Sequence, residues 1–150
     1  LLICTTGFND EDKAKIKEAG KAIPVLLSSN TSLGINVFRK ILKSISAELS
    51  TFDINIVEKH HTKKIDAPSG TAKTLSEDIK NATGREHVEI SAIRAGTIPG
   101  EHTVIFSGVD EILEIKHTAF SKKIFARGAI NLAMKLSSKS PGYYLMEDFF

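Results

Sequence analysis

The sequence predicts an α/β protein: a βαβ unit, the remnant of a Rossmann-like domain, is followed by an open mixed β-sheet with helices packed on one face. Three observations predict this class. Short apolar runs suit buried strands, segments of helical periodicity lie between them, and the elements follow the order βαβ, α, β, α, β, β, β, α. With 150 residues, of which 41% are apolar and 25% charged, the chain can bury a core and lacks the composition of a disordered protein.

The first thirty residues predict one βαβ crossover. The apolar run at residues 1–5 suits a short buried strand, Asn9 or Asp10 can cap the helix that follows, and residues 23–28 suit a second strand. The two strands are expected to be parallel, because a helix connects them. Since the chain begins inside an apolar run, we expect the rest of a doubly wound sheet to precede it.

A longer helix is predicted at residues 32–49. Leu33, Val37, Ile41 and Ile45 recur every four residues, which places them on one face of a helix. Three further apolar residues lie alongside them, namely Phe38, Leu42 and Leu49.

The second half of the chain predicts the open sheet. Its strands are expected at residues 52–57, 88–95, 102–107 and 111–118. The last two are expected to be antiparallel, because a short turn at residues 108–110 joins them. Thr71 and Ser121 begin two further helices, and Pro141 ends the second. Residues 58–71 have no apolar periodicity and are expected to form a loop. A sheet covered on one face leaves the other for a second copy of the chain.

Charge and cysteine content exclude several classes of protein. Twenty Lys and Arg residues against eighteen Asp and Glu leave a formal charge of +2, which gives no general attraction for nucleic acid or for an anionic membrane. Cys4 is the only cysteine, so an intrachain disulfide is impossible, and no apolar run reaches the roughly 20 residues that span a bilayer. We therefore expect a cytoplasmic protein in which any anion-binding site is local.

The segment of residues 58–72 is the most informative in the chain. It places two histidines and three lysines between Lys59 and Lys64, ahead of the helix start at residues 69–71. A helix start offers backbone N–H groups and the positive end of the helix dipole, so these are the parts of a carboxylate- or phosphate-binding pocket. The alternative is a solvated basic loop followed by an ordinary helix cap, and spacing alone leaves both open.

The two adjacent histidines of this segment are poor metal ligands. Side chains of neighbouring residues in an extended segment point apart, and no third ligand follows His60 and His61 at a suitable spacing. We therefore expect no metal site.

Two loops that follow the first two predicted strands suggest a nucleotide. Residues 5–8 follow the first strand and residues 28–34 follow the second, and both are rich in Ser, Thr, Asn and Gly. In a doubly wound sheet, ligands bind beyond the carboxyl ends of the strands, where such small polar side chains can reach a ribose or a carboxamide. The same residues also make ordinary loops.

These motifs together resemble those of the bacterial dihydrodipicolinate reductases, also called 4-hydroxy-tetrahydrodipicolinate reductases. The matching motifs are Thr5-Thr6-Gly7-Phe8, Asn30 with Ser32 and Gly34, residues 58–72, Arg94-Ala95-Gly96, Gly100-Glu101-His102, and Phe125-Ala126 with Gly128-Ala129. The chain is similar to the later portion of that family. The resemblance implies three parts, which are the end of a dinucleotide-binding domain (1–31), a substrate-binding, catalytic and oligomerisation domain (32–138) and a C-terminal tail (139–150).

The resemblance implies that NADPH or NADH reduces a cyclic dicarboxylate in the pathway to diaminopimelate and lysine. It implies His60 as the proton donor and Lys64 as a second acid or a substrate contact, with His61, Gly70 and Thr71 in substrate binding. The chemistry is consistent with these roles. Hydride addition to a conjugated imine leaves an enamine that must be protonated, and histidine exchanges protons near neutral pH.

The resemblance also implies cofactor loops and an assembly. The cofactor residues would be Cys4, Thr5, Thr6, Ser28, Ser29, Asn30 and Thr31. A glycine-rich fingerprint would precede Leu1, so the preference between NADH and NADPH is open. The family suggests a homotetramer, with a small dicarboxylate and a separate nucleotide-binding half as further partners. Two hypotheses remain: an oxidoreductase portion that is active with that half, or a folded, non-catalytic oligomeric remnant that binds a dicarboxylate without turnover.

Overall fold

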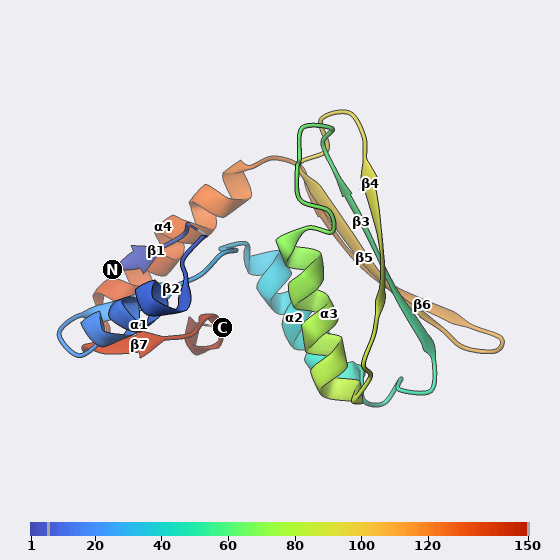
Figure 1. The fold of residues 1–150 in the computed structure, drawn as a ribbon, viewed down its shortest axis with the longest axis horizontal. Helices are drawn as coiled ribbons and strands as arrows, with labels where there is room; N and C mark the ends of the chain where they lie inside the picture. Colours follow the sequence, from blue (N-terminus) through green and yellow to red (C-terminus); the bar gives the residue numbers. More distant parts are fainter. Residues whose placement is uncertain (6, 150) are drawn as a thin grey trace. The chain divides into compact units, whose positions relative to one another are not determined.

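The chain folds into two compact units. The computed structural model describes residues 1–5 and 7–149, and groups residues 1–36 with the segment from Lys123 onward, separately from Val37–Lys122 (Figure 1). The final helix therefore belongs with the first elements, because it packs on their strands, whereas the resemblance placed it in the domain of residues 32–138. Among the described residues, no helix combines the length and the apolar character that crossing a bilayer requires.

The first unit is built on a three-stranded parallel sheet. Its strands are β1 (Leu2–Ile3), β2 (Pro24–Leu27) and β7 (Gly142–Tyr144), in the order β1-β2-β7. Helix α1 (Asp10–Ala19) connects β1 to β2, and helix α4 (Lys123–Ser137) packs on both strands. Of the two predicted caps, Asn9 and Asp10, Asn9 caps α1: its side chain accepts from the backbone N–H of Asp12, whose carboxylate accepts in return from the backbone N–H of Asn9. The predicted βαβ unit is confirmed.

The C-terminal residues form part of this unit. We expected a tail at residues 139–150, but β7 pairs with β2, and the 3-10 helix Met146–Phe149 follows it. The core of the unit is formed by buried side chains from β2, α4 and this last turn, namely Leu26, Leu132, Leu136, Met146 and Phe149. A three-residue strand has no periodicity of its own, so only its pairing with β2 reveals it.

The second unit holds a four-stranded mixed sheet. Its elements are most of α2 (Leu33–Ile45), β3 (Asp53–His60), α3 (Gly70–Thr83), β4 (Glu89–Arg94), β5 (Gly100–Ser107) and β6 (Ile112–Ala119). The strand order is β4-β3-β5-β6, in which β3 is parallel to β4 and antiparallel to β5. Strands β5 and β6 are antiparallel, as predicted.

Helices α2 and α3 lie together on one face of this sheet (Figure 1). Leu75 and Ile79 of α3 are wholly buried, as is Ile56 of β3. The two helices are joined by Arg39, which donates to both carboxylate oxygens of Asp78 at 2.6 and 3.0 Å. An open mixed sheet with helices on one face is the predicted fold class, and it is confirmed.

Helix α2 buries only some of the apolar residues that predicted it. Leu33, Val37 and Ile41 are 57%, 41% and 38% exposed. The buried apolar residues of the helix are Ile35, Phe38 and Leu42. Apolar side chains lie on two sides of this helix, and periodicity does not tell which side packs. Of the apolar residues that predicted this helix, Phe38 and Leu42 are therefore buried, whereas Leu33, Val37 and Ile41 are exposed.

Gly128 of α4 generates a stability prediction. A Cβ built there would lie 1.9 Å from the carbonyl oxygen of Thr31, whose hydroxyl donates to the carbonyl of Phe125 on the same helix at 2.7 Å. We expect Gly128→Ala to lower the free energy of unfolding by about 1–3 kcal/mol or more, because backbone cannot move aside as a flexible side chain can. Chemical denaturation measures this.

Gly70→Ala is the matched control for that change. Gly70 also lies in a helix, but a Cβ there would meet no atom within 4 Å. We expect its free energy of unfolding to stay at or above that of the wild type. Equal destabilisation by the two substitutions would contradict the packing of α4 on the loop of Thr31.

Candidate functional site

The end of β3 brings two polar side chains to the helix-covered face of the sheet. Ile54, Ile56, Glu58 and His60 are all buried and alternate with more exposed neighbours along the strand. Residues 58–60 were expected in a loop, and this was wrong. Strand β3 continues to His60 because it is paired with β4 on one side and with β5 on the other.

Glu58 is the most deeply buried charged group of this site. Its side chain is 0% exposed, and its oxygens contact His60 Nδ1 at 2.5 Å, two guanidinium nitrogens of Arg94 at 2.7 and 2.9 Å, and the backbone N–H of Ser69 at 3.0 Å. Burial alone would raise the pKa of Glu58, but these donors outweigh burial and lower it. Glu58 is therefore an ionised acceptor.

The side chain of His60 is a buried imidazole, and one of its two ring nitrogens is already hydrogen-bonded. Nδ1 faces Glu58, and Nε2 lies beside Gly100, where a Cβ would be 3.2 Å from it. Burial lowers the pKa of His60, Glu58 opposes this, and the charges of Lys64 and Arg94 add to the lowering. A nearby anion favours the protonated, charged form of such a neutral ring, so the ring is suited to proton exchange at neutral pH.

The start of α3 is tied to the same carboxylate. Ser69 is the N-cap: its hydroxyl accepts from the backbone N–H of Ala72 at 3.2 Å and lies 3.1 Å from Nε2 of His102, while its own N–H donates to Glu58. The first turn of α3 has no acidic residue, so the positive end of the helix dipole is not neutralised from within the helix. Ser69 and Glu58 were not among the predicted site residues.

Lys64 is paired with the exposed carboxylate of Asp66, two residues along the chain. Lys64 Nζ donates to Asp66 at 2.7 Å, and hydrogen bonds from Lys64 first, and then from backbone groups that include that of Gly70, lower the pKa of Asp66. Arg94 also donates to the backbone carbonyl of Asp66 at 2.6 Å. The residues at this helix start can therefore hold a carboxylate.

The remaining predicted substrate residues lie nearby along the chain. His61 is half-buried, and its buried Nδ1 has no hydrogen-bond partner within the part of the chain that the structure describes. Thr71 is half-buried in the first turn of α3. Among the described residues, no three His, Cys, Asp or Glu side chains are grouped so that they could hold a metal ion.

The predicted cofactor residues lie in the first unit, after β1 and β2. These strands are adjacent and parallel, so their carboxyl ends share one edge of the sheet. Cys4, Thr5 and Ser29 are exposed. Thr6 lies outside the described residues.

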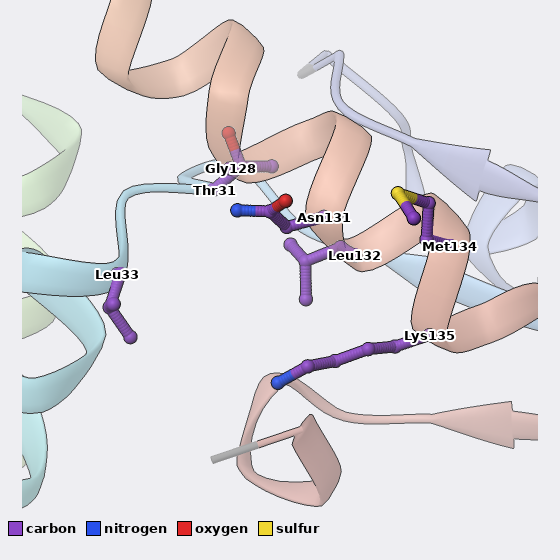
Figure 2. Close-up of a pocket in the computed structure, with 7 residues that line it drawn as sticks. All are labelled: Thr31, Leu33, Gly128, Asn131, Leu132, Met134 and Lys135. Carbon is purple, nitrogen blue, oxygen red and sulfur yellow. The ribbon is translucent and has the colours of Figure 1, made fainter.

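Most of the second cofactor loop is bonded internally. The Ser28 hydroxyl donates to the carbonyl of Asn30 at 3.0 Å, and the Asn30 side chain accepts from the backbone N–H of Ser32 at 2.9 Å. The Thr31 hydroxyl donates to a backbone carbonyl of α4, that of Phe125. Thr31 and Leu33 line a pocket of about 320 Å³ with residues of α4, and its walls are largely apolar (Figure 2).

Comparison with protein families and known proteins gives a consistent result. Residues 34–150 match the family described as "Dihydrodipicolinate reductase, C-terminus". The chain is 43% identical to a 4-hydroxy-tetrahydrodipicolinate reductase of Brachyspira hyodysenteriae, over 99% of this chain and 71% of that protein. It is 46% identical to the protein of that name from Clostridium novyi, over 99% of this chain and 66% of the relative. The chain thus spans about two thirds of their length.

A solved structure has the same fold. The dipicolinate-bound dihydrodipicolinate reductase of Paenisporosarcina sp. TG-14 superposes with a TM-score of 0.79 at 21% sequence identity, over 99% of this chain and 64% of that one.

The buried histidines generate a prediction of pH-dependent stability. Burial, with a smaller repulsion from His60, lowers the pKa of His102 to about 4. The unfolded chain therefore binds more protons than the folded chain between pH 6.5 and 4, so stability falls as the pH falls through that range. From pH 7 to pH 5, His102 alone should account for a loss of about 2 kcal/mol in the free energy of unfolding.

Urea unfolding of His102→Gln at pH 7 and pH 5 measures the contribution of His102 to this loss of stability. The variant should lose about 2 kcal/mol less than the wild type between pH 7 and pH 5. His87→Gln is the control, because the His87 side chain is 79% exposed, and it should behave as the wild type does. Identical pH dependence in all three proteins would show that His102 is not held neutral by the fold.

Proposed function

The chain belongs to the dihydrodipicolinate reductase family, and on that premise we propose that it carries the substrate-binding and proton-donating part of an NAD(P)H-dependent reductase. The reaction is the reduction of 4-hydroxy-tetrahydrodipicolinate to tetrahydrodipicolinate, in the biosynthesis of diaminopimelate and lysine. Its substrate is a ring with two carboxylates, so the site must provide cationic or N–H donors for those groups and an acid for the ring.

One observation carries this proposal: Lys64 already donates to a carboxylate, that of Asp66, at 2.7 Å, just ahead of the start of α3. A substrate carboxylate that takes the place of Asp66 would receive the same donors. Lys64 would supply a charge-assisted hydrogen bond, and Gly70 and Thr71 would supply the first turn of the helix. His61, next along the chain from His60, would complete the binding residues.

His60 supports the acid role in this proposal. Its Nδ1 is bonded to an ionised carboxylate, which leaves Nε2 to carry the exchanged proton. The ring is buried, and a dianionic substrate beside it would raise the pKa of His60 and so favour the charged, proton-donating form. Substrate binding would thereby prepare the acid for the step that needs it.

The cofactor residues present in the chain fit part of a nicotinamide nucleotide. When bound, the cofactor supplies the hydride. Cys4, Thr5 and Ser29 are exposed beyond the adjacent ends of β1 and β2, where they could contact a ribose or a carboxamide. Thr31 is less suited, because its hydroxyl already donates to Phe125. The residues that would hold the pyrophosphate belong to the remaining third of the relatives' length.

The proposal includes assembly of several copies of the chain. The sheet face opposite α2 and α3 carries the ion pairs of Glu101 with Lys59 and Lys116, at 2.8 and 2.9 Å, and the 43% exposed Ile93. A mixed polar and apolar sheet surface of this kind suits packing against a second copy. Light scattering distinguishes a homotetramer from a monomer.

The alternative is a folded remnant that binds a dicarboxylate without turning it over. The same donors around Asp66 would support binding in that protein, so the binding site is the part that both hypotheses share. A binding experiment therefore tests the site without the nucleotide-binding half.

Dipicolinate is the probe for that experiment. We expect calorimetry to detect binding of dipicolinate to the chain, and Lys64→Ala to weaken it about tenfold or more, because a charged hydrogen bond to a carboxylate is lost.

Lys63→Ala is the matched control. Lys63 precedes Lys64 in the same loop and is exposed, so its removal changes the net charge equally but should alter the affinity by less than about threefold. Equal effects of the two substitutions would remove Lys64 from the site, and no binding by the wild type would contradict the proposal.

A further inference from the structure

Glu58 is a buried charge for which the proposed reaction has no direct use. Its side chain is 0% exposed, so its charge needs internal partners to be tolerated. Those partners come from three elements: His60 on its own strand β3, Arg94 on β4, and the backbone of Ser69 at the cap of α3. A carboxylate held in this way has a fixed position relative to all three.

The hydrogen bonds of Glu58 determine which nitrogen of His60 carries a proton. Arg94 and the backbone N–H of Ser69 can only donate, so both oxygens of Glu58 act as acceptors toward them. An ionised carboxylate has no proton to give to Nδ1. At 2.5 Å from Oε2, Nδ1 of His60 must therefore be the donor. In the neutral ring, Nε2 then carries the lone pair.

Among the described residues whose charges act on the pKa of His60, Glu58 is the negative one. From β4 comes Arg94, from the loop after β3 comes Lys64, and from β5 comes the ring of His102, whose centroid lies 5.2 Å from that of His60. Burial, Lys64 and Arg94 lower the pKa of His60, and Glu58 opposes them. Without Glu58, burial and these two cations would lower the pKa further.

We propose that Glu58 is a positioning residue that holds His60 in the Nδ1–H tautomer, makes Nε2 the nitrogen that exchanges the proton, and fixes this ring to the cap of α3. The catalytic meaning of this assignment rests on the proposed function, in which His60 is the proton donor. The tautomer itself does not, because it follows from the contacts of Glu58. Arg94 completes the unit by bonding Glu58 and the carbonyl of Asp66, in the loop that holds Lys64.

The wild-type chain provides the first test. The ring-nitrogen chemical shifts of the chain, labelled with ¹⁵N-histidine and followed from pH 5 to pH 9, report the tautomer and the pKa of His60. Above that pKa we expect Nδ1 to be protonated and Nε2 to be unprotonated. A ring that is protonated at Nε2 instead would overturn the proposal, and this result does not depend on any variant folding.

Two variants then test whether Glu58 is the cause. Glu58→Gln should lower the proton affinity of His60 about tenfold or more, since the opposing charge is lost. The double variant Glu58→Leu, Arg94→Met removes both charges, so no unpaired ion is buried, and it should release His60 into a mixture of tautomers. A folded double variant in which His60 keeps the Nδ1–H tautomer would contradict the assignment.

Glu77→Gln is the control for loss of a carboxylate. Glu77 is 61% exposed and pairs with Lys80 on the surface of α3, so the tautomer and the titration of His60 should be unchanged. Dipicolinate binding measured on the same samples separates the two claims. Absence of binding to the wild type counts against the proposed function, whereas the ring-nitrogen shifts decide the role of Glu58.

Discussion

The ionised carboxylate of Glu58 is the interaction on which the rest of the site depends. Removing a carboxylate from water costs several kcal/mol unless other groups replace its hydration, and here Arg94, His60 and Ser69 do so. The same bonds join β3, β4 and the start of α3 at one point. The imidazole, the helix cap and the loop of Lys64 are therefore arranged by a single buried charge, rather than by a mobile loop.

This arrangement supports the proposal that a small open sheet holds a charged ligand. Helix α3 directs its first turn toward the end of β3, and the capping residue is bonded to the strand through Glu58. Lys64 already donates to a carboxylate, that of Asp66, so under the proposed function little reorganisation would accompany the entry of a substrate carboxylate. A preformed site of this kind favours tight and oriented binding.

Much of the site could be predicted from the sequence, and the reason for what was missed is specific. The histidine and lysine segment and the helix start are local in the chain, so His60, Lys64 and Gly70 could be proposed together. The predicted strand ended too early, at Val57, because the apolar periodicity of the sequence stops there. In the structure every second residue of β3 is buried, and Glu58 and His60 continue this alternation. Because both side chains are polar, the pattern of apolar residues in the sequence does not reveal it. The neighbouring sequence does not indicate that a charged residue is buried.

The other differences also come from contacts between distant segments. Strand β7 exists because it pairs with β2, more than a hundred residues earlier in the chain. The buried face of α2 is chosen by what packs against it, so Ile35 and Phe38 are covered and Leu33 is not. In contrast, α1 was predicted well, since its cap at Asn9 is a local interaction.

The most direct test is an activity measurement on a chimaera, in which the N-terminal segment that precedes the matched region of the Clostridium novyi relative is joined to Leu1 of this chain. We expect the chimaera to oxidise NADPH or NADH when 4-hydroxy-tetrahydrodipicolinate is added, and His60→Gln in the chimaera to lower kcat more than it changes KM. A folded chimaera that binds both the cofactor and dipicolinate, but shows no turnover, would contradict the account and leave this chain as a binding remnant.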